Sequence, residues 1–231
     1  MDNIQLLYVG NIVSGKAAAS TQVLQFLMRV ANLGYGKTVE VHWAGEDGVR
    51  RTVLADYCVT AGDGSEYWRA ELRFQRQAKA DLPGDIRFSL RLQHEGREYW
   101  DNNDGCQGYF CAAGSGGRTT GLVPVLNLSP LQGLSGSQRS IPLKFAVDAG
   151  LAAEKVTVHW TLDDWRHVHK TSCRLQPGRR SATRSGYAGL HPVQHWSTHL
   201  KLDGAFRVQY SICCEGKEQT FGITMPDRTT G

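Results

Sequence analysis

Two stretches of this chain decide its fold: VEVHWAGEDGVRR, which begins at Val39, and VTVHWTLDDWRHV, which begins at Val156. They are separated by 156 − 39 = 117 residues, and both open on the same Val-x-Val-His-Trp pattern. Apolar residues two positions apart are typical of a strand with one buried face, so Trp43 and Trp160 are expected in the core with the valines. The sequence therefore predicts two copies of one β-rich unit.

The similarity between the two halves continues beyond these stretches. EYWRAELRF matches QHWSTHLKL, with Trp68 opposite Trp196 at an offset of 196 − 68 = 128 residues. RFSLRLQHEGRE matches FRVQYSICCEGKE, with Gly96 opposite Gly216 at an offset of 216 − 96 = 120 residues. Insertions in loops explain the drift between offsets. We expect Trp68 and Trp196 to be core residues, because each begins an inward-facing series of apolar positions.

A segment rich in small residues, AAGSGGRTTG (Ala112–Gly121), lies between the two copies and is typical of a flexible linker. The predicted domains are a first unit over 1–111, this linker over 112–121 and a second unit over 122–231. Short strands separated by turn residues predict an all-β fold of two tandem immunoglobulin-like antiparallel β-sandwiches. A closed barrel in each unit is the alternative.

Composition narrows the class of protein. The 231 residues are 41% hydrophobic and 21% charged, which is typical of a folded globular chain, and no stretch approaches the roughly 20 apolar residues of a membrane helix. The formal net charge of +4 is small for this length, so neither nucleic acid nor a membrane surface is an expected partner. The first residues lack a basic leader, and the six cysteines lack a disulfide-framework spacing. We expect a cytoplasmic protein with reduced thiols.

Three motifs resemble those of one family of sugar-binding modules. VANLGYGKTVEVHW (Val30–Trp43) is similar to its strand–loop–strand signature, EGREYWDNNDGCQGY (Glu95–Tyr109) to its terminal motif, and TLDDWRHV (Thr161–Val168) to its Asp-Asn-Trp loop. The chain thus resembles two tandem copies of carbohydrate-binding module family 21, as found in fungal glucoamylases and in glycogen-targeting subunits of protein phosphatase 1. The resemblance covers nearly the whole chain except Arg174–Val193. It implies non-catalytic binding of α-glucan, as starch, glycogen or maltooligosaccharide, and a role in tethering a partner to polysaccharide.

The chemistry of the matching residues suits a sugar. An α-glucan presents weakly polar C–H faces and a rim of hydroxyl groups, which bind flat aromatic rings and amide or carboxylate groups. Asn and Asp favour turn conformations that hold such polar groups at a loop surface. The candidate carbohydrate-binding residues are Tyr99, Trp100, Asp101, Asn102, Asn103, Tyr109, Asp164 and Trp165.

These residues also have a purely structural interpretation. Asp-Asn-Asn-Asp-Gly makes a good turn by itself, and one of the two adjacent aromatic residues, Tyr99 or Trp100, must face inward on a strand. A tryptophan in a polar loop, such as Trp165, exposes a large apolar surface that either a ligand or the protein itself covers. The sequence is compatible with both interpretations.

Each copy keeps only half of the family's site. Gly48 stands where the second copy has Trp165, and Gln219–Gly222 stand where the first copy has Tyr99–Asn102. In the family, the loop aromatic and the terminal motif together form the main sugar surface. Either both sites are weakened, or the two halves combine across the domain interface, which is a hypothesis. A protein-interaction adaptor with decayed sugar sites, such as a phosphatase-targeting subunit, is therefore the alternative function.

Phosphatase-targeting subunits usually carry a short basic-Val-x-aromatic docking peptide outside the module. The nearest match here, Arg207–Tyr210, falls in a predicted strand, so we expect it to be inaccessible. A protein partner of another kind stays open.

The sequence patterns that would indicate a nucleotide-binding protein, a metal site or an enzyme are weaker. GNIVSGKA (Gly10–Ala17) fits the Gly-x4-Gly-Lys pattern of a phosphate-binding loop, but Ala17 stands where the Mg²⁺-binding Ser or Thr belongs. His167 and His169 alternate on one strand, which is more typical of a solvated face than of a metal site. No Ser or Cys lies in a nucleophile elbow, and no carboxylate pair stands out among the acidic residues. We therefore expect neither an enzyme, nor a metal site, nor a cofactor.

Overall fold

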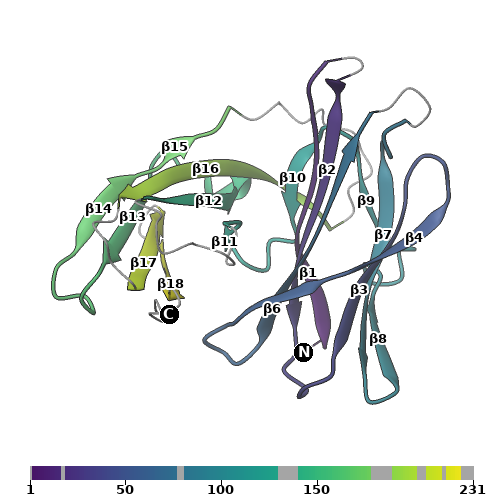
Figure 1. The fold of residues 1–231 in the computed structure, drawn as a ribbon, viewed down its shortest axis with the longest axis horizontal. Helices are drawn as coiled ribbons and strands as arrows, with labels where there is room; N and C mark the ends of the chain where they lie inside the picture. Colours follow the sequence, from purple (N-terminus) through teal and green to yellow (C-terminus); the bar gives the residue numbers. More distant parts are fainter. Residues whose placement is uncertain are drawn as a thin grey trace, which may run out of the picture. The chain divides into compact units, whose positions relative to one another are not determined.

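The computed structural model describes residues 2–16, 19–76, 81–129, 140–177, 189–201, 207–214 and 217–224, with the backbone alone at 207 and 217–224. The chain divides into two compact units (Figure 1). Unit 1 comprises Met1–Val123 with Gly178–Pro192, and unit 2 comprises Pro124–Pro177 with Val193–Gly231.

The described residues form antiparallel strands and contain no α-helix, which confirms the all-β class. Helical structure in them is limited to short 3-10 turns, such as η2 (Ala149–Leu151). Within the same residues, no helix has the length and apolar character needed to cross a bilayer.

Unit 1 contains two sheets (Figure 1). The first has the order β10 (Gly116–Thr119), β1 (Ile4–Ser14), β2 (Thr21–Val30), β6 (Glu66–Gln75), β5 (Asp56–Thr60). The second has the order β4 (Arg50–Leu54), β3 (Thr38–Ala44), β7 (Ile86–His94), β8 (Arg97–Asp101), and β9 (Tyr109–Cys111) pairs with β7.

The core of unit 1 lies between these sheets because alternate residues of the central strands face inward. On β3, Val39, Val41 and Trp43 are at most 5% exposed, as the alternating pattern predicts. Phe26 of β2 meets Phe88 of β7 edge to face, with ring centroids 5.0 Å apart, so the two sheets are joined by direct aromatic packing.

Unit 2 also packs two sheets around one core. The first has the order β11 (Val125–Asn127), β12 (Ser140–Asp148), β16 (His191–Lys201), with β15 (Arg174–Leu175) pairing with β16. The second has the order β14 (His169–Ser172), β13 (Val156–Thr161), β17 (Arg207–Cys214), β18 (Lys217–Thr224). The buried residues shared by the two sheets include Phe145, Val158, Trp160 and Trp196.

The two units share a strand order. The series β4-β3-β7-β8 of unit 1 corresponds to β14-β13-β17-β18 of unit 2, and β1-β2-β6-β5 corresponds to β11-β12-β16-β15. The aligned sequence stretches therefore occupy matching strands. Trp43 and Trp160, at 5% and 8% exposed, take equivalent inward positions, and both predictions of core tryptophans are confirmed.

The predicted linker over 112–121 is wrong for its central residues. Gly116–Thr119 form β10, which pairs with β1 in the register Tyr8↔Thr119 to Asn11↔Gly116. The Thr119 hydroxyl also donates a hydrogen bond to the carbonyl of Leu7 at 2.9 Å. The pattern of small residues is compatible with a strand here because β1 satisfies the backbone hydrogen-bonding groups.

The second predicted unit, 122–231, is not one continuous segment in the structure, since residues 178–192 are grouped with unit 1. Leu190 is 6% exposed in the core of that unit, and His191 and Pro192 pair with β10. Pairing between residues so far apart in the chain leaves no local signal in the sequence.

Candidate functional site

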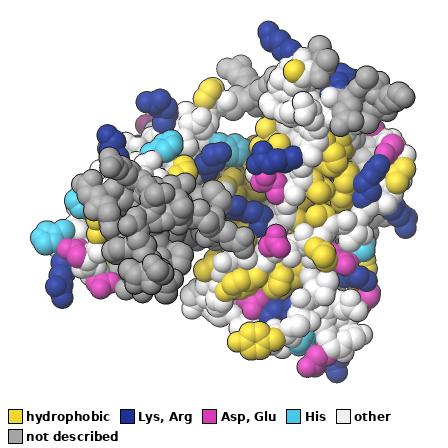
Figure 2. Space-filling view, viewed as in Figure 1, with side chains coloured by type: hydrophobic (Ala, Val, Ile, Leu, Met, Phe, Trp, Pro, Cys, Tyr) yellow, Lys and Arg dark blue, Asp and Glu magenta, His cyan; other side chains and the backbone are white. Residues whose placement is uncertain are grey.

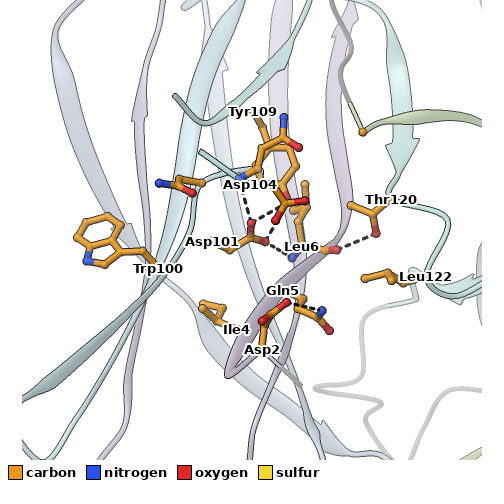
Figure 3. Close-up of a pocket in the computed structure, with 13 residues that line it drawn as sticks. Asp2, Ile4, Gln5, Leu6, Trp100, Asp101, Asp104, Tyr109, Thr120 and Leu122 are labelled. Atoms are coloured by element: carbon orange, nitrogen blue, oxygen red, sulfur yellow. Dashed lines mark hydrogen bonds between the residues drawn. The ribbon is translucent and has the colours of Figure 1, made fainter. Parts of the chain in front are cut away.

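The two adjacent aromatic residues of the terminal motif lie on opposite faces of β8. Tyr99 packs against the core of unit 1, whereas Trp100 is 47% exposed on the outer face of its sheet. Figure 3 shows the Trp100 ring directed away from Asp101 and Tyr109. Of the two rings, Trp100 is the one that a ligand can reach.

Asp101 and Tyr109 form an internal bracket. The Asp101 carboxylate accepts hydrogen bonds from the Leu6 amide at 2.7 Å, from the Asn103 amide at 3.2 Å and from the Tyr109 hydroxyl at 2.8 Å (Figure 3). Tyr109 is 6% exposed, and its ring stacks on Phe88 with centroids 5.2 Å apart. Burial, and next the nearby Asp101 charge, raise the pKa of Tyr109 well above its usual value. Both residues therefore hold the loop to β1, and both also line a pocket that lies beside the loop.

The loop after Asp101 has turn geometry throughout. Asn103 and Asp104 have positive φ of 60° and 52°, and the Asn102 side-chain oxygen accepts a hydrogen bond from the Gly105 amide at 3.2 Å. Asn102 is exposed and Asn103 is half-buried. These short polar side chains tolerate the left-handed conformation, and they present amide groups beside Trp100.

A pocket of about 340 Å³ opens beside this loop (Figure 3). Its polar lining includes Asp2, Gln5, Asn102, Asn103, Asp104 and Thr120. The motif thus provides one exposed aromatic ring and a rim of hydrogen-bonding groups, which keeps the sugar-binding hypothesis for Trp100, Asn102 and Asn103.

In unit 2, Trp165 lies in the loop between β13 and β14 and is 37% exposed. Asp164 and Trp165 both have positive φ, at 54° and 69°, which is costly for residues other than glycine. Hydrogen bonds hold this conformation: the Thr161 hydroxyl accepts from the Trp165 amide at 3.2 Å, and the Asp163 carboxylate accepts from the His167 amide at 3.0 Å.

Asp163 also interacts with the side chain of His167, whose Nδ1 lies 2.5 Å from the carboxylate. The side-chain hydrogen bond from His167 is the main cause that lowers the pKa of Asp163 well below its usual range. The loop that carries Trp165 is therefore braced by charged and polar partners on both sides.

Sequence reasoning missed a cleft of about 530 Å³ in unit 1, between the loop that precedes β3 and the strands β5 and β6. Its aromatic lining consists of Tyr35, Tyr57 and Trp68. Tyr35 is fully exposed, at 102% of its reference area, and Tyr57 is 44% exposed. Tyr57 meets Trp68 edge to face, with ring centroids 5.9 Å apart.

A buried ion pair supports the cleft. Lys37 and Glu66 have side chains 4% and 10% exposed, with the ammonium 2.8 Å from the carboxylate. Lys37 also donates to the Gly34 carbonyl at 2.6 Å, and Glu66 accepts from the Trp68 indole nitrogen at 2.8 Å. Lys37 and Glu66 therefore join the loop that carries Tyr35 to the strand that carries Trp68.

One sequence signal pointed to this cleft. Tyr35 stands between two glycines, Gly34 and Gly36, whose φ values of 119° and 77° are conformations that other residues rarely adopt. An aromatic residue between two such glycines lies outside the alternating pattern of a strand, which is compatible with the exposed ring of Tyr35. The prediction of Trp68 as a core residue is only partly right, because Trp68 packs on the core and also lines the cleft.

The structure also bears on the phosphate-loop-like segment and on the possibility of a metal site. The phosphate-loop-like segment begins inside β1 and reaches a turn at Gly15, with φ of 86°, while residues 17–18 lie outside the described part of the chain. The described residues contain no group of three or more His, Cys, Asp or Glu side chains that could hold a metal ion. Figure 2 shows acidic and basic side chains interspersed on the face in view.

No protein-family model matches this chain, and no curated protein is similar to it in sequence. Among solved structures, the starch-binding domain of Rhizopus oryzae glucoamylase, in complex with beta-cyclodextrin and maltoheptaose, is 18% identical with a TM-score of 0.36, over 49% of this chain and 95% of that chain. The carbohydrate-binding module of the muscle glycogen-targeting subunit of protein phosphatase 1 is 17% identical with a TM-score of 0.33, over 49% and 78%.

The cycloalternan-forming enzyme of Listeria monocytogenes, in complex with a pentasaccharide substrate, is 14% identical with a TM-score of 0.31. That match covers 90% of this chain and 18% of the enzyme.

Proposed function

We propose that this chain binds α-glucan, as starch, glycogen or a maltooligosaccharide, without acting on it chemically. The observation that carries the proposal is the cleft of unit 1, where Tyr35, Tyr57 and Trp68 surround about 530 Å³ of space. That volume falls in the range of small-molecule sites, about 300–1,000 Å³.

The cleft matches the two surfaces of a glucose unit. The aromatic rings offer flat apolar faces to its C–H groups, and Asn32 and Thr60 add an amide and a hydroxyl to the lining. Because the Lys37–Glu66 pair already fixes the loop, less ordering entropy is lost on binding.

The lining of the cleft favours binding over hydrolysis. A glycosidase needs two carboxyl groups about 5–10 Å apart on either side of the scissile bond. Among the described residues that line the cleft, Glu66 is the one carboxylate, and it is engaged by Lys37 and by Trp68. Nothing in this lining provides an acid and a base together.

Trp100 in unit 1 and Trp165 in unit 2 are proposed as further contact points, each with polar neighbours from its own loop. We interpret the two units, which share a strand order, as two modules on one chain. Several weak sites on one chain raise the effective concentration at a polymer, so binding to insoluble starch should exceed binding to a short oligomer. A chain that binds polymer through several sites could also tether a partner to polysaccharide, and we include this role in the proposal.

The alternative of an adaptor with decayed sugar sites also has a specific observation behind it. Asp101 and Tyr109 form hydrogen bonds inside unit 1, and Gly48 stands where the second copy has Trp165, so unit 1 offers fewer of the expected sugar contacts. The segment nearest to a phosphatase-docking peptide, Arg207–Tyr210, is inaccessible as expected, because Val208 and Tyr210 are fully buried in β17. An adaptor role would therefore use another surface.

The test is a starch and glycogen pull-down with the full chain. Wild type is compared with Tyr35→Ala, Trp100→Ala and Trp165→Ala, and Leu54→Ala, an exposed apolar residue outside the three surfaces, is the matched control. We expect wild type and the control to bind, and Tyr35→Ala to lose most of the binding. Circular dichroism verifies folding. If folded wild type remains in the supernatant with both polymers, the proposal is wrong and the adaptor function replaces it.

A further inference from the structure

A row of three side chains crosses the outer face of the second sheet of unit 1. In the strand register, Arg91 of β7 lies opposite Glu40 of β3 on one side and opposite Trp100 of β8 on the other. Residues directly opposite on one face of a sheet are close enough to interact. His42 of β3 completes the group, with its ring centroid 5.0 Å from that of Trp100.

Arg91 is fixed in place by two carboxylates. Its Nε and Nη2 lie 2.9 Å and 2.7 Å from the same oxygen of Glu40, and its Nη1 lies 2.8 Å from Glu98. The Arg91 side chain is 22% exposed and Glu40 is 13% exposed, so this network is partly shielded from water. A planar guanidinium with bonds on two sides has little freedom to rotate.

The guanidinium carbon of Arg91 lies 5.8 Å from the centre of the Trp100 ring, within the range of a cation–π interaction. The Trp100 indole nitrogen also lies 3.4 Å from Glu98, the carboxylate that binds Arg91. Arg91 thus contacts the ring of Trp100 and Glu98 contacts its indole nitrogen, while 47% of the residue's surface stays exposed.

We propose that Arg91 is a positioning residue for a sugar-binding platform formed by Trp100. It acts by holding the indole ring in one orientation before the ligand arrives, with Glu40 and Glu98 as its own anchors. This inference rests on the proposed function, because it assigns a role to one of the contact points named there. The guanidinium of Arg91 binds the carboxylates of Glu40 and Glu98, so Arg91 is not proposed to bind the sugar itself.

The expected effect follows from the ordering cost that Arg91 removes. A side chain immobilised at a binding surface costs about 0.5–1.5 kcal/mol, so loss of Arg91 should weaken binding at Trp100 about two- to twelvefold. Arg91→Lys should fall between wild type and Arg91→Ala, since a single ammonium cannot bridge the two carboxylates in the same plane.

The test is a double-mutant cycle in the full chain, with maltoheptaose as the probe. A parent carrying Tyr35→Ala and Trp165→Ala has both other surfaces weakened, so that Trp100 contributes a larger share of the remaining affinity. Arg91→Ala, Trp100→Ala and both together are then added to this parent. We expect Arg91→Ala to weaken binding by the factor above, and to have no further effect once Trp100 is alanine.

Two readouts separate positioning from a general structural role. Arg87→Ala is the matched control, because Arg87 lies on the same strand over another ring, Phe110, at 5.4 Å. The ¹⁹F resonance assigned to Trp100 in protein labelled with 5-fluorotryptophan should shift in Arg91→Ala and stay in place in Arg87→Ala. Urea denaturation verifies that both variants are folded.

Three results would overturn the inference. One is an equal effect of Arg91→Ala with and without Trp100, which would make Arg91 a direct ligand. A second is an unchanged affinity in Arg91→Ala. The third is a parent that no longer binds maltoheptaose while wild type still binds starch, which would remove Trp100 as a platform and leave the proposed function intact.

Discussion

Replacement of Tyr35 by alanine is the sharpest test of the cleft. The ring is fully exposed, at 102% of its reference area, so its removal takes away no packing within the protein. The proposed role of this side chain is therefore contact with a ligand and not stabilisation of the fold. We expect Tyr35→Ala to fold like wild type and to lose affinity for α-glucan.

The size of the loss can be worked out from area. A fully covered aromatic side chain buries about 150–250 Å², and a sugar stacked on one face of Tyr35 would cover roughly 60 Å² of it. At about 25 cal/mol per Å², this contact contributes about 1.5 kcal/mol, or roughly a tenfold change in affinity. The free energy of unfolding should change by less than about 0.5 kcal/mol, as for other exposed substitutions.

Isothermal titration with maltoheptaose measures the first quantity, and urea denaturation measures the second. Tyr35→Phe keeps the flat ring and should retain most of the affinity, whereas Leu54→Ala, at a site 62% exposed in wild type, should behave as wild type. A Tyr35→Ala protein with wild-type affinity would refute the stacking argument. A large loss of stability would show instead that the loop depends on this ring.

Three further predictions follow from the polar interior of unit 1. Asp101→Ala removes the acceptor of three hydrogen bonds and should cost about 2–3 kcal/mol in urea denaturation; an unchanged midpoint would contradict the bracket. Lys37→Met leaves Glu66 buried without its partner and should cost about 3–5 kcal/mol, with recovery of part of that loss in the double variant with Glu66→Gln; no recovery would argue against a coupled pair. Burial raises the pKa of the Cys111 thiol to about 11, so the folded chain keeps a proton that the unfolded chain loses above about pH 8.5. Stability should therefore fall between about pH 9 and 11, and Cys111→Ala should flatten that slope by up to about 1.4 kcal/mol per pH unit; equal slopes in urea titrations would contradict this assignment.

The sequence predicted the fold class because a strand's side-chain period of two is a local property. The Val-x-Val-x-Trp series at Val39 and Val156 gave the inward face of two strands without knowledge of their neighbours. The same rule required one of Tyr99 and Trp100 to face inward. It did not say which, because that depends on the sheet against which β8 packs.

The candidate site was only partly predictable for a related reason. Asp101 and Tyr109 have the right chemistry for a sugar, yet the Leu6 amide and the Phe88 ring occupy them inside unit 1. A polar side chain looks the same in sequence whether its partner is a ligand or a distant backbone amide. Only the tertiary structure revealed that Asp101 accepts a hydrogen bond from the Leu6 amide, far away in the chain, and that the Tyr109 ring stacks on Phe88.

The sequence by itself determined the alternating strands, the repeat and the buried tryptophans, since each depends on residues within one strand or on one comparison between the two halves. The tertiary structure alone decided that Gly116–Thr119 complete a sheet and that Tyr35, Tyr57 and Trp68 line one cleft. These arrangements depend on which strands become neighbours. That choice is made by the burial of a shared core and by the pairing of backbone hydrogen bonds, and local periodicity carries no record of it.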